Sequence, residues 1–145
     1  LPDGRVRLYW VQDPPAGDSE HREWVVSATS TDTGGTSFTM DQGQRTTGGY
    51  VDFEVLQAKP NDWIAVMSST PETVPDEPQG IFVATSEDGL RWDVNPENLA
   101  PTSMSYLDPT GVSIGHNQWK LVLAESSNIP GATDYNLVET TLNII

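Results

Sequence analysis

Tyr50-Val51-Asp52 and Tyr106-Leu107-Asp108 stand 56 residues apart, and the same offset brings much of the remaining chain onto itself. Further positions share this offset: Trp63 with Trp119, Ala28-Thr29-Ser30 with Ala84-Thr85-Ser86, and Asp32 with Asp88. No gap is needed between residues 28 and 119, so the match indicates an internal repeat. We predict about two and a half copies of one unit, as a partial copy at 1–45, a full copy at 46–101 and a partial copy at 102–145.

Each copy consists of short segments that are rich in β-branched and aromatic residues. Gly, Pro, Asn and Asp separate these segments, which are too short for helices of ordinary length. The pattern predicts four antiparallel strands in a full copy. The longer strands are expected near residues 5–11, 24–30, 51–57, 62–68, 80–86, 106–113, 118–124 and 134–142, with short fourth strands at 37–40 and 91–94.

Four-stranded sheets that repeat with a period near 50 residues are typical of a β-propeller. We therefore predict an all-β fold of antiparallel four-stranded blades that form an incomplete ring. The alternative is a β-sandwich in which the repeats are accidental. Since the first and last copies each lack a strand, we expect either a piece of a propeller or a homo-oligomer that completes the ring. In the second case a dimer would form through residues 4–11 and 134–145.

The composition excludes several classes of partner. The 145 residues include 21 acidic and 7 basic side chains, which gives a formal net charge of −14. Such a charge repels nucleic acid and anionic membrane surfaces. No cysteine is present, so disulfides, thiolate metal sites and cysteine nucleophiles are absent. No apolar run approaches the roughly 20 residues that span a bilayer.

Two segments resemble a known motif. Ser86-Glu-Asp-Gly-Leu-Arg-Trp92 resembles the Asp box (BNR repeat) of sialidase-like propellers, Ser-x-Asp-x-Gly-x-Thr-Trp, in a shortened form. Residues 30–38 look like a second box with a longer turn, whereas the third copy has Leu142 and Ile144 where Ser and Asp should be. The resemblance implies a secreted or periplasmic protein, although no signal segment opens this chain.

In the resembling family the Asp box is structural and lies away from the active site. Its aspartate can accept backbone N–H groups across the turn, its glycine allows positive φ, and its aromatic residue can pack beneath the turn. The residues to which this role is assigned are Ser30, Asp32, Gly34, Phe38, Ser86, Asp88, Gly89 and Trp92.

The repeated Tyr-x-Asp segments suggest catalysis. In sialidase-like and five-bladed furanosidase propellers, an aspartate at the start of the innermost strand faces the central channel. The resemblance thus implies that Asp52 and Asp108, with Glu54, act on glycans. Glycoside hydrolysis needs two carboxylates, and crowding can keep one protonated. The alternative is that both aspartates cap loops, because a feature repeated in every copy is usually architectural.

Strand direction places Asp52 and Asp108 on the rim opposite the Asp boxes. The acidic loops at 13–23 and 71–78 are expected on the same rim, whose Asp and backbone oxygens are ligands that calcium accepts. No Asp-x-Asp-x-Asp-Gly loop occurs, however, and we predict no cofactor. His21 and His116 are expected to be solvated. Trp10, Trp63 and Trp119, which lie on strands, are expected in the core.

Three functions remain open. The first is a glycan-handling segment that belongs to a sialidase-like or furanosidase-like hydrolase or acts as a binding module, with carbohydrate as its partner. Sialidase activity itself needs three clustered arginines, and the arginines of this chain are scattered over strands and loops. The second is a non-enzymatic interaction propeller, because a fold alone does not define a function. The third is a remnant of a larger enzyme.

Overall fold

The computed structural model describes residues 1–18, 22–70, 77–127 and 134–144. Its secondary structure is entirely β, in three antiparallel sheets. Sheet 1 contains β1 (Arg7–Gln12), β2 (Trp24–Ser30) and β3 (Phe38–Met40). Sheet 2 contains β4 (Tyr50–Lys59), β5 (Asp62–Ser69), β6 (Ile81–Ser86) and β7 (Asp93–Val94). Sheet 3 contains β8 (Ser105–Gly115), β9 (Gln118–Ser126) and β10 (Tyr135–Asn143).

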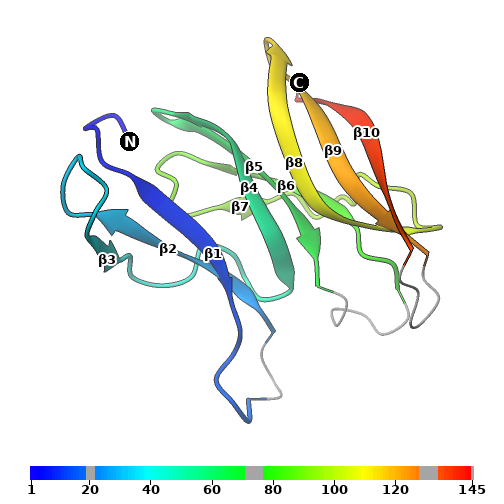
Figure 1. Ribbon diagram of the computed structural model, residues 1–145, viewed down its shortest axis with the longest axis horizontal. Coiled ribbons are helices and arrows are strands. Elements are labelled where there is room, and N and C mark those ends of the chain that lie inside the picture. The colour runs from blue at the N-terminus through cyan, green and yellow to red at the C-terminus, as the bar shows by residue number, and fades with distance from the viewer. Residues whose placement is uncertain (19–21, 71–76, 128–133, 145) are drawn as a thin grey trace.

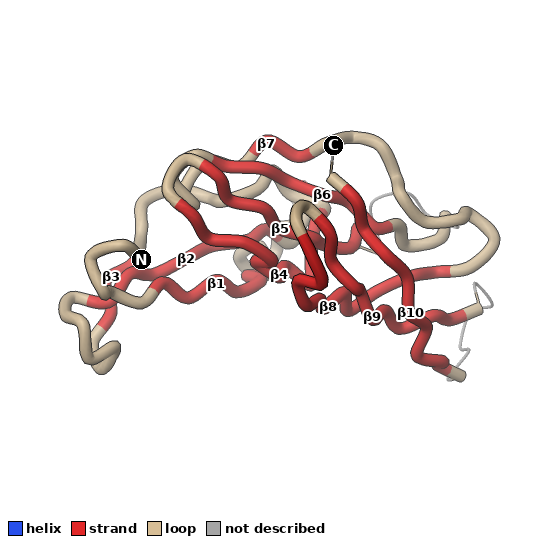
Figure 2. The backbone as a smooth tube through the Cα atoms, turned by 90° about the horizontal axis from the view of Figure 1, so that it is seen from above, coloured by secondary structure: helices blue, strands red, loops and turns tan. Residues whose placement is uncertain are grey.

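The strands follow the repeat. Every expected strand overlaps an observed one, so the all-β prediction is confirmed. Sheet 2 has all four strands in the order β4-β5-β6-β7, whereas among the described residues sheet 1 lacks the first strand of the unit and sheet 3 lacks the last. Figure 1 shows the three sheets side by side in chain order, from the blue strands of sheet 1 to the yellow and red strands of sheet 3. Figure 2 shows the same succession from above, as expected for consecutive blades.

The backbone repeats as closely as the sequence does. Among the described residues, four that are not glycine have positive φ: Asp52 (53°), Asn61 (59°), Asp108 (50°) and Asn117 (54°). They form two pairs at the 56-residue offset. Asn61 and Asn117 lie in the tight turns that join the first two strands of sheets 2 and 3, a conformation that asparagine tolerates. The repeat therefore extends to individual backbone angles.

The core lies between the sheets. The largest cluster joins the face of sheet 2 to sheet 3, and it consists of Ile64, Val66, Ile81, Val83, Trp119, Leu121, Leu123 and Leu142. The opposite face of sheet 2 packs toward sheet 1 through Trp63, Ala65, Met67, Ala84 and Trp92. Alternate residues of β5 thus enter two different clusters, which explains why this strand is apolar on both faces. In the described part of the chain no helix is long and apolar enough to cross a bilayer.

Candidate functional site

Asp52 and Asp108 occupy equivalent β-bulges. The register of β4 with β5 shifts between Val51 and Glu54, and that of β8 with β9 shifts between Leu107 and Thr110. In each case two residues face one on the partner strand, and the first of the two is the aspartate with positive φ. A bulge of this kind re-aims a side chain out of the regular alternation of the strand. The repeat therefore delivers the same redirected carboxyl group from two neighbouring sheets.

Both bulges lie at the end of the sheets opposite the predicted Asp boxes. Tyr50, at the start of β4, pairs with Ser69, whereas the other end of β5 pairs Trp63 with Ser86, next to the β6–β7 turn. The placement on opposite rims follows from this register. The acidic loops expected on the rim of the bulges fall partly on residues 19–21 and 71–76, outside the described residues, and so does His21.

The two aspartates meet each other. The backbone N–H of Asp108 donates a hydrogen bond to Oδ2 of Asp52 (3.3 Å), and the buried Ser68 hydroxyl donates to the same oxygen. Partial burial raises the pKa of Asp108, and the charge of Asp52 and a hydrogen bond between the two carboxyl groups raise it further. We refer to Asp52, Asp108 and the nearby Glu54 as the carboxylate site.

The carboxylate site opens into a depression of about 290 Å³, whose lining residues are Trp10, Val11, Asp52, Phe53, Glu54, Asp108 and Pro109. Trp63 and Trp119 are buried as expected, but the expectation that Trp10 lies in the core is wrong, because its side chain is 38% exposed. The reason is that β1 has apolar residues on both faces, and no described sheet covers the face that carries Trp10. Strand alternation could not distinguish the two faces.

The carboxylate site was also compared with the ligand sets that hold metal ions. The described residues contain no group of three or more His, Cys, Asp or Glu side chains placed to hold a metal ion. The site offers instead a pair of carboxyl groups in contact, a third carboxylate and an aromatic side chain. Such a combination is suited to binding a polyhydroxylated ligand and to proton transfer.

On the opposite rim, Asp88 organises the turn between β6 and β7. Its Oδ1 accepts the backbone N–H groups of Leu90 (2.8 Å) and Arg91 (2.9 Å). Partial burial acts to raise the pKa of Asp88, but these hydrogen bonds, with smaller contributions from Ser86 and the Arg91 charge, outweigh it and lower the pKa. Gly89 has a φ of 71°, and its carbonyl accepts the indole N–H of the buried Trp92 (3.1 Å).

The turn after β2 resembles this arrangement only in part. Asp32 Oδ1 accepts the N–H groups of Gly34 (2.9 Å) and Gly35 (3.1 Å). The positive φ expected at Gly34 belongs instead to Gly35 (63°), because the longer turn moves the strained position by one residue. The expectation that Phe38 packs beneath the turn is also wrong. Phe38 is 36% exposed, since it lies on a face of sheet 1 that no described sheet covers.

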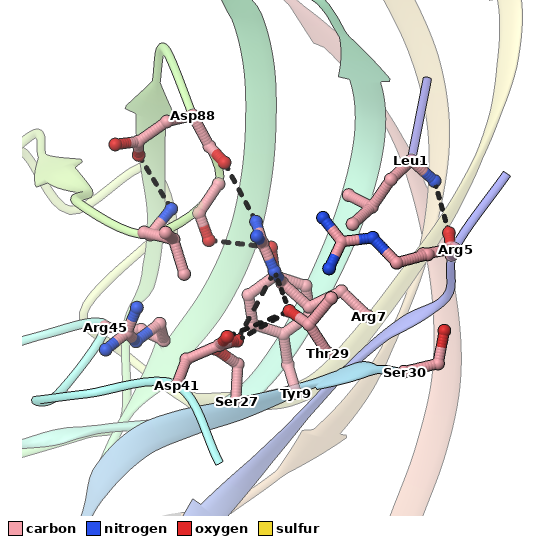
Figure 3. Close-up of polar contacts among 12 residues, drawn as sticks. Leu1, Arg5, Arg7, Tyr9, Ser27, Thr29, Ser30, Asp41, Arg45 and Asp88 are labelled. Carbon is pink, nitrogen blue, oxygen red and sulfur yellow. Dashed lines mark hydrogen bonds and ion pairs between the residues drawn. The ribbon is translucent and has the colours of Figure 1, made fainter. Parts of the chain in front are cut away.

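Sheet 1 rests on the Asp88 turn. The Arg7 guanidinium donates to the Asp88 carbonyl (2.8 Å), and the Tyr9 hydroxyl donates to the Gly89 carbonyl (2.7 Å). Figure 3 shows Arg7 between this turn and Asp41, with which it forms an ion pair at 3.4 Å. A Cβ at Gly89 would lie 2.7 Å from the Tyr9 hydroxyl, so the close approach requires glycine. The sequence pattern predicts a strand at residues 5–11, but nothing in it indicates this contact between sheets.

Three consecutive antiparallel sheets define this chain as part of a β-propeller. No protein-family model matches it, and no curated protein matches it. Solved structures of the Bombyx mori GH32 beta-fructofuranosidase do match, with a TM-score of 0.68 and 13% identity over 97% of this chain and 32% of the enzyme. One of them is an aspartate-to-alanine mutant in complex with sucrose.

GH32 beta-fructofuranosidases have a five-bladed propeller domain. The present chain spans about a third of the length of the matched structures. At this identity the likeness shows the fold, and it supports a propeller in general without pointing to the Asp-box class in particular.

Proposed function

We propose that this chain is a glycan-handling propeller segment of the glycoside hydrolase type, with furanosides as its ligands. The observation that carries the proposal is that two bulged aspartates from neighbouring sheets meet beside a depression lined by an exposed tryptophan. The choice of furanosides is supported by the fold, which is similar to that of a fructofuranosidase observed with sucrose. The proposed catalytic residues are Asp52, Asp108 and Glu54.

The contact between Asp52 and Asp108 restricts how these residues can act. Glycosidases hold their two carboxyl groups on opposite sides of the scissile bond, about 5 Å apart for retention and about 6.5–9.5 Å for inversion. The backbone N–H of Asp108 reaches Oδ2 of Asp52 (3.3 Å), so the two aspartates lie side by side and do not enclose a sugar between them. We therefore assign Asp52 and Asp108 to one side of the bond as a single proton-holding pair. Glu54, which lines the same depression, is the candidate on the other side.

Trp10 supplies the apolar surface that a sugar ring needs. Trp10 is one of the residues that line the depression, and the C–H face of a furanose can pack on an aromatic side chain while its hydroxyl groups bond to carboxylates. Leu8 offers a matched comparison, because it is 47% exposed on the same strand but does not line the depression. Trp10 should therefore contribute to glycan binding, and Leu8 should not.

For the opposite rim we propose a structural role of the Asp-box kind, as in sialidase-like propellers. The turn residues Ser86, Asp88, Gly89 and Trp92 make hydrogen bonds with one another and support sheet 1, and they are far from the carboxylate site along the strands. Ser30 and Asp32 supply a partial copy, in which Ser30 Oγ donates to the Asp32 carbonyl. No catalysis is assigned to these residues.

The proposal is tested by titrating the chain with fructosides (sucrose included), arabinofuranosides and sialosides, with NMR for binding and product analysis for turnover. We expect furanoside binding that Trp10→Ala weakens at least about tenfold and that Leu8→Ala leaves unchanged. Asp52→Asn, Asp108→Asn and Glu54→Gln should each abolish any turnover while the fold persists. Absence of binding to every glycan, or equal effects of the Trp10 and Leu8 variants, contradicts the proposal.

A non-enzymatic interaction module is the second candidate. It is favoured by the uncovered face of sheet 1, where four apolar side chains are exposed in addition to Trp10: Val6, Leu8, Phe38 and Met40. Isolated exposed apolar residues are ordinary, but a group on one sheet face marks an interface. Chain association without glycan binding would favour this function.

A further inference from the structure

The two bulged aspartates are equivalent in the repeat, but the residues around them differ at several positions, and one of these differences removes a hydrogen-bond donor. Val51 pairs with Ser68 just before the first bulge, and Leu107 pairs with Ala124 just before the second. Ser68 and Ala124 are equivalent by the 56-residue offset, and both side chains are buried. Among the residues paired just before the two bulges, Ser68 is therefore the one with a side-chain hydrogen-bond donor.

The Ser68 hydroxyl group is one of two hydrogen-bond donors to Asp52. Its Oδ2 accepts the Ser68 hydroxyl, which has no solvent exposure, and the backbone N–H of Asp108 (3.3 Å). Hydrogen bonds donated to a carboxylate favour its ionised form. At the equivalent place beside Asp108, the Ala124 methyl group can donate nothing. Two carboxyl groups in contact cannot both be ionised without strong repulsion, so the pair retains a proton over part of the pH range.

We propose that Ser68 is a positioning residue that makes the symmetric pair asymmetric: its hydroxyl group anchors the carboxyl group of Asp52, and Asp108, which has no such donor beside it, is the member that carries the proton of the pair. The raised pKa of Asp108, which burial causes together with the charge and contact of Asp52, supports this assignment. The inference rests on the proposed function, in which the pair acts as one proton-holding group. Asp108 is then the member that can give a proton to the oxygen of a leaving group.

The experiment is a carboxyl-detected NMR titration of the chain without any glycan. In the wild type, the higher of the two titration steps should report on Asp108. In Ser68→Ala the proton should move toward Asp52, with at least about a tenfold change in the proton affinity of Asp108, or about one pH unit. Ser68→Thr, which restores a hydroxyl group, should return the titration to the wild-type order.

Two further variants make the test specific. Ala124→Ser adds the missing donor beside Asp108 and should lower the pH of its titration step. Ser126→Ala removes another buried serine hydroxyl on β9, which bonds only to the Ser127 carbonyl among the hydrogen bonds of the described residues, and should change neither step. Retention of the wild-type amide spectrum shows which variants are folded.

The proposal is overturned if the higher step belongs to Asp52 in the wild type, or if Ser68→Ala and Ala124→Ser both leave the two steps unchanged. Because no glycan is present, these outcomes are independent of the proposed function. Where the chain turns over a furanoside, Ser68→Ala should also shift the acid-side or base-side limit of the pH–rate profile. If the role of Ser68 were only structural, Ser68→Ala would lower the stability of the fold without shifting that limit.

Discussion

At the scale of single residues, Asp88 supports more of the molecule than its partly exposed position suggests. Its carboxylate closes the β6–β7 turn through the N–H groups of Leu90 and Arg91, and Arg7 of sheet 1 donates to its carbonyl. Loss of the carboxylate leaves two N–H groups without this acceptor and loosens the turn on which sheet 1 rests. Replacement of Asp88 should therefore lower the stability of the fold and leave glycan binding unchanged.

We predict that Asp88→Ala lowers the free energy of unfolding by about 1–2 kcal/mol at neutral pH. The pKa of Asp88 is lowered in the folded chain, so its contribution is present above the unfolded pKa and is lost as the pH falls through the folded pKa. The difference between variant and wild type should therefore shrink in acid. Denaturant melts at several pH values measure it, with Glu87→Ala as the exposed control on the same turn. A difference that is independent of pH would contradict the role of the carboxylate.

At the scale of elements, the same aromatic position has different surroundings in sheets 1 and 2. Trp92 enters the cluster between these two sheets and makes edge-to-face contacts with Phe53 (5.1 Å) and Tyr9 (6.1 Å) between ring centroids. Phe38 occupies the corresponding place at the start of β3, where no described sheet covers it. The contribution of an aromatic residue depends on the neighbouring blade, not on the motif alone.

We predict that Trp92→Ala costs about 3–5 kcal/mol of unfolding free energy, because it leaves a cavity between two sheets. Phe38→Ala should cost less than about 1 kcal/mol, since its side chain is already exposed. Thermal melts at low salt and low protein concentration compare the two variants. Equal losses would mean that Phe38 is covered in solution and that the face of sheet 1 is not free.

The strand positions could be predicted because short apolar segments and the constant offset leave few alternatives. The bulges could not, since nothing in Tyr-x-Asp distinguishes an aspartate with positive φ from a regular strand residue. The sequence also could not predict which face of sheet 1 carries Trp10, because β1 has apolar residues on both faces. In the sequence, Ser68 is a serine that aligns with Ala124 of the next copy. Its importance depends on a hydrogen bond to Asp52 that only the folded chain reveals.

At the scale of the whole molecule, the proposal of self-association concerns the strands at the edges of the described sheets. β1 and β10 are edge strands of sheets 1 and 3 in the described chain. Exposed apolar side chains accompany both edges, with Leu8 at 47% and Leu137 at 80% exposure. Two chains would bring six sheets together, within the propeller range of about 4–8 blades but in a wider ring than the five-bladed domain of the GH32 enzymes.

We therefore retain the prediction of a homodimer whose contacts involve residues 4–11 and 134–145, as a proposal to be tested by mass. The charge of −14 on each chain opposes association. At physiological ionic strength, salt screens this repulsion between charges that are more than about 8 Å apart. Light scattering should give twice the 15.8 kDa chain mass in moderate salt and a smaller mass in low salt. Leu8→Glu and Leu137→Glu should keep the chain monomeric, whereas Val112→Glu, at an exposed position on β8, should not. A monodisperse monomer in moderate salt with a cooperative melt would rule out the dimer, because the edges of β1 and β10 would then be tolerated without a partner chain.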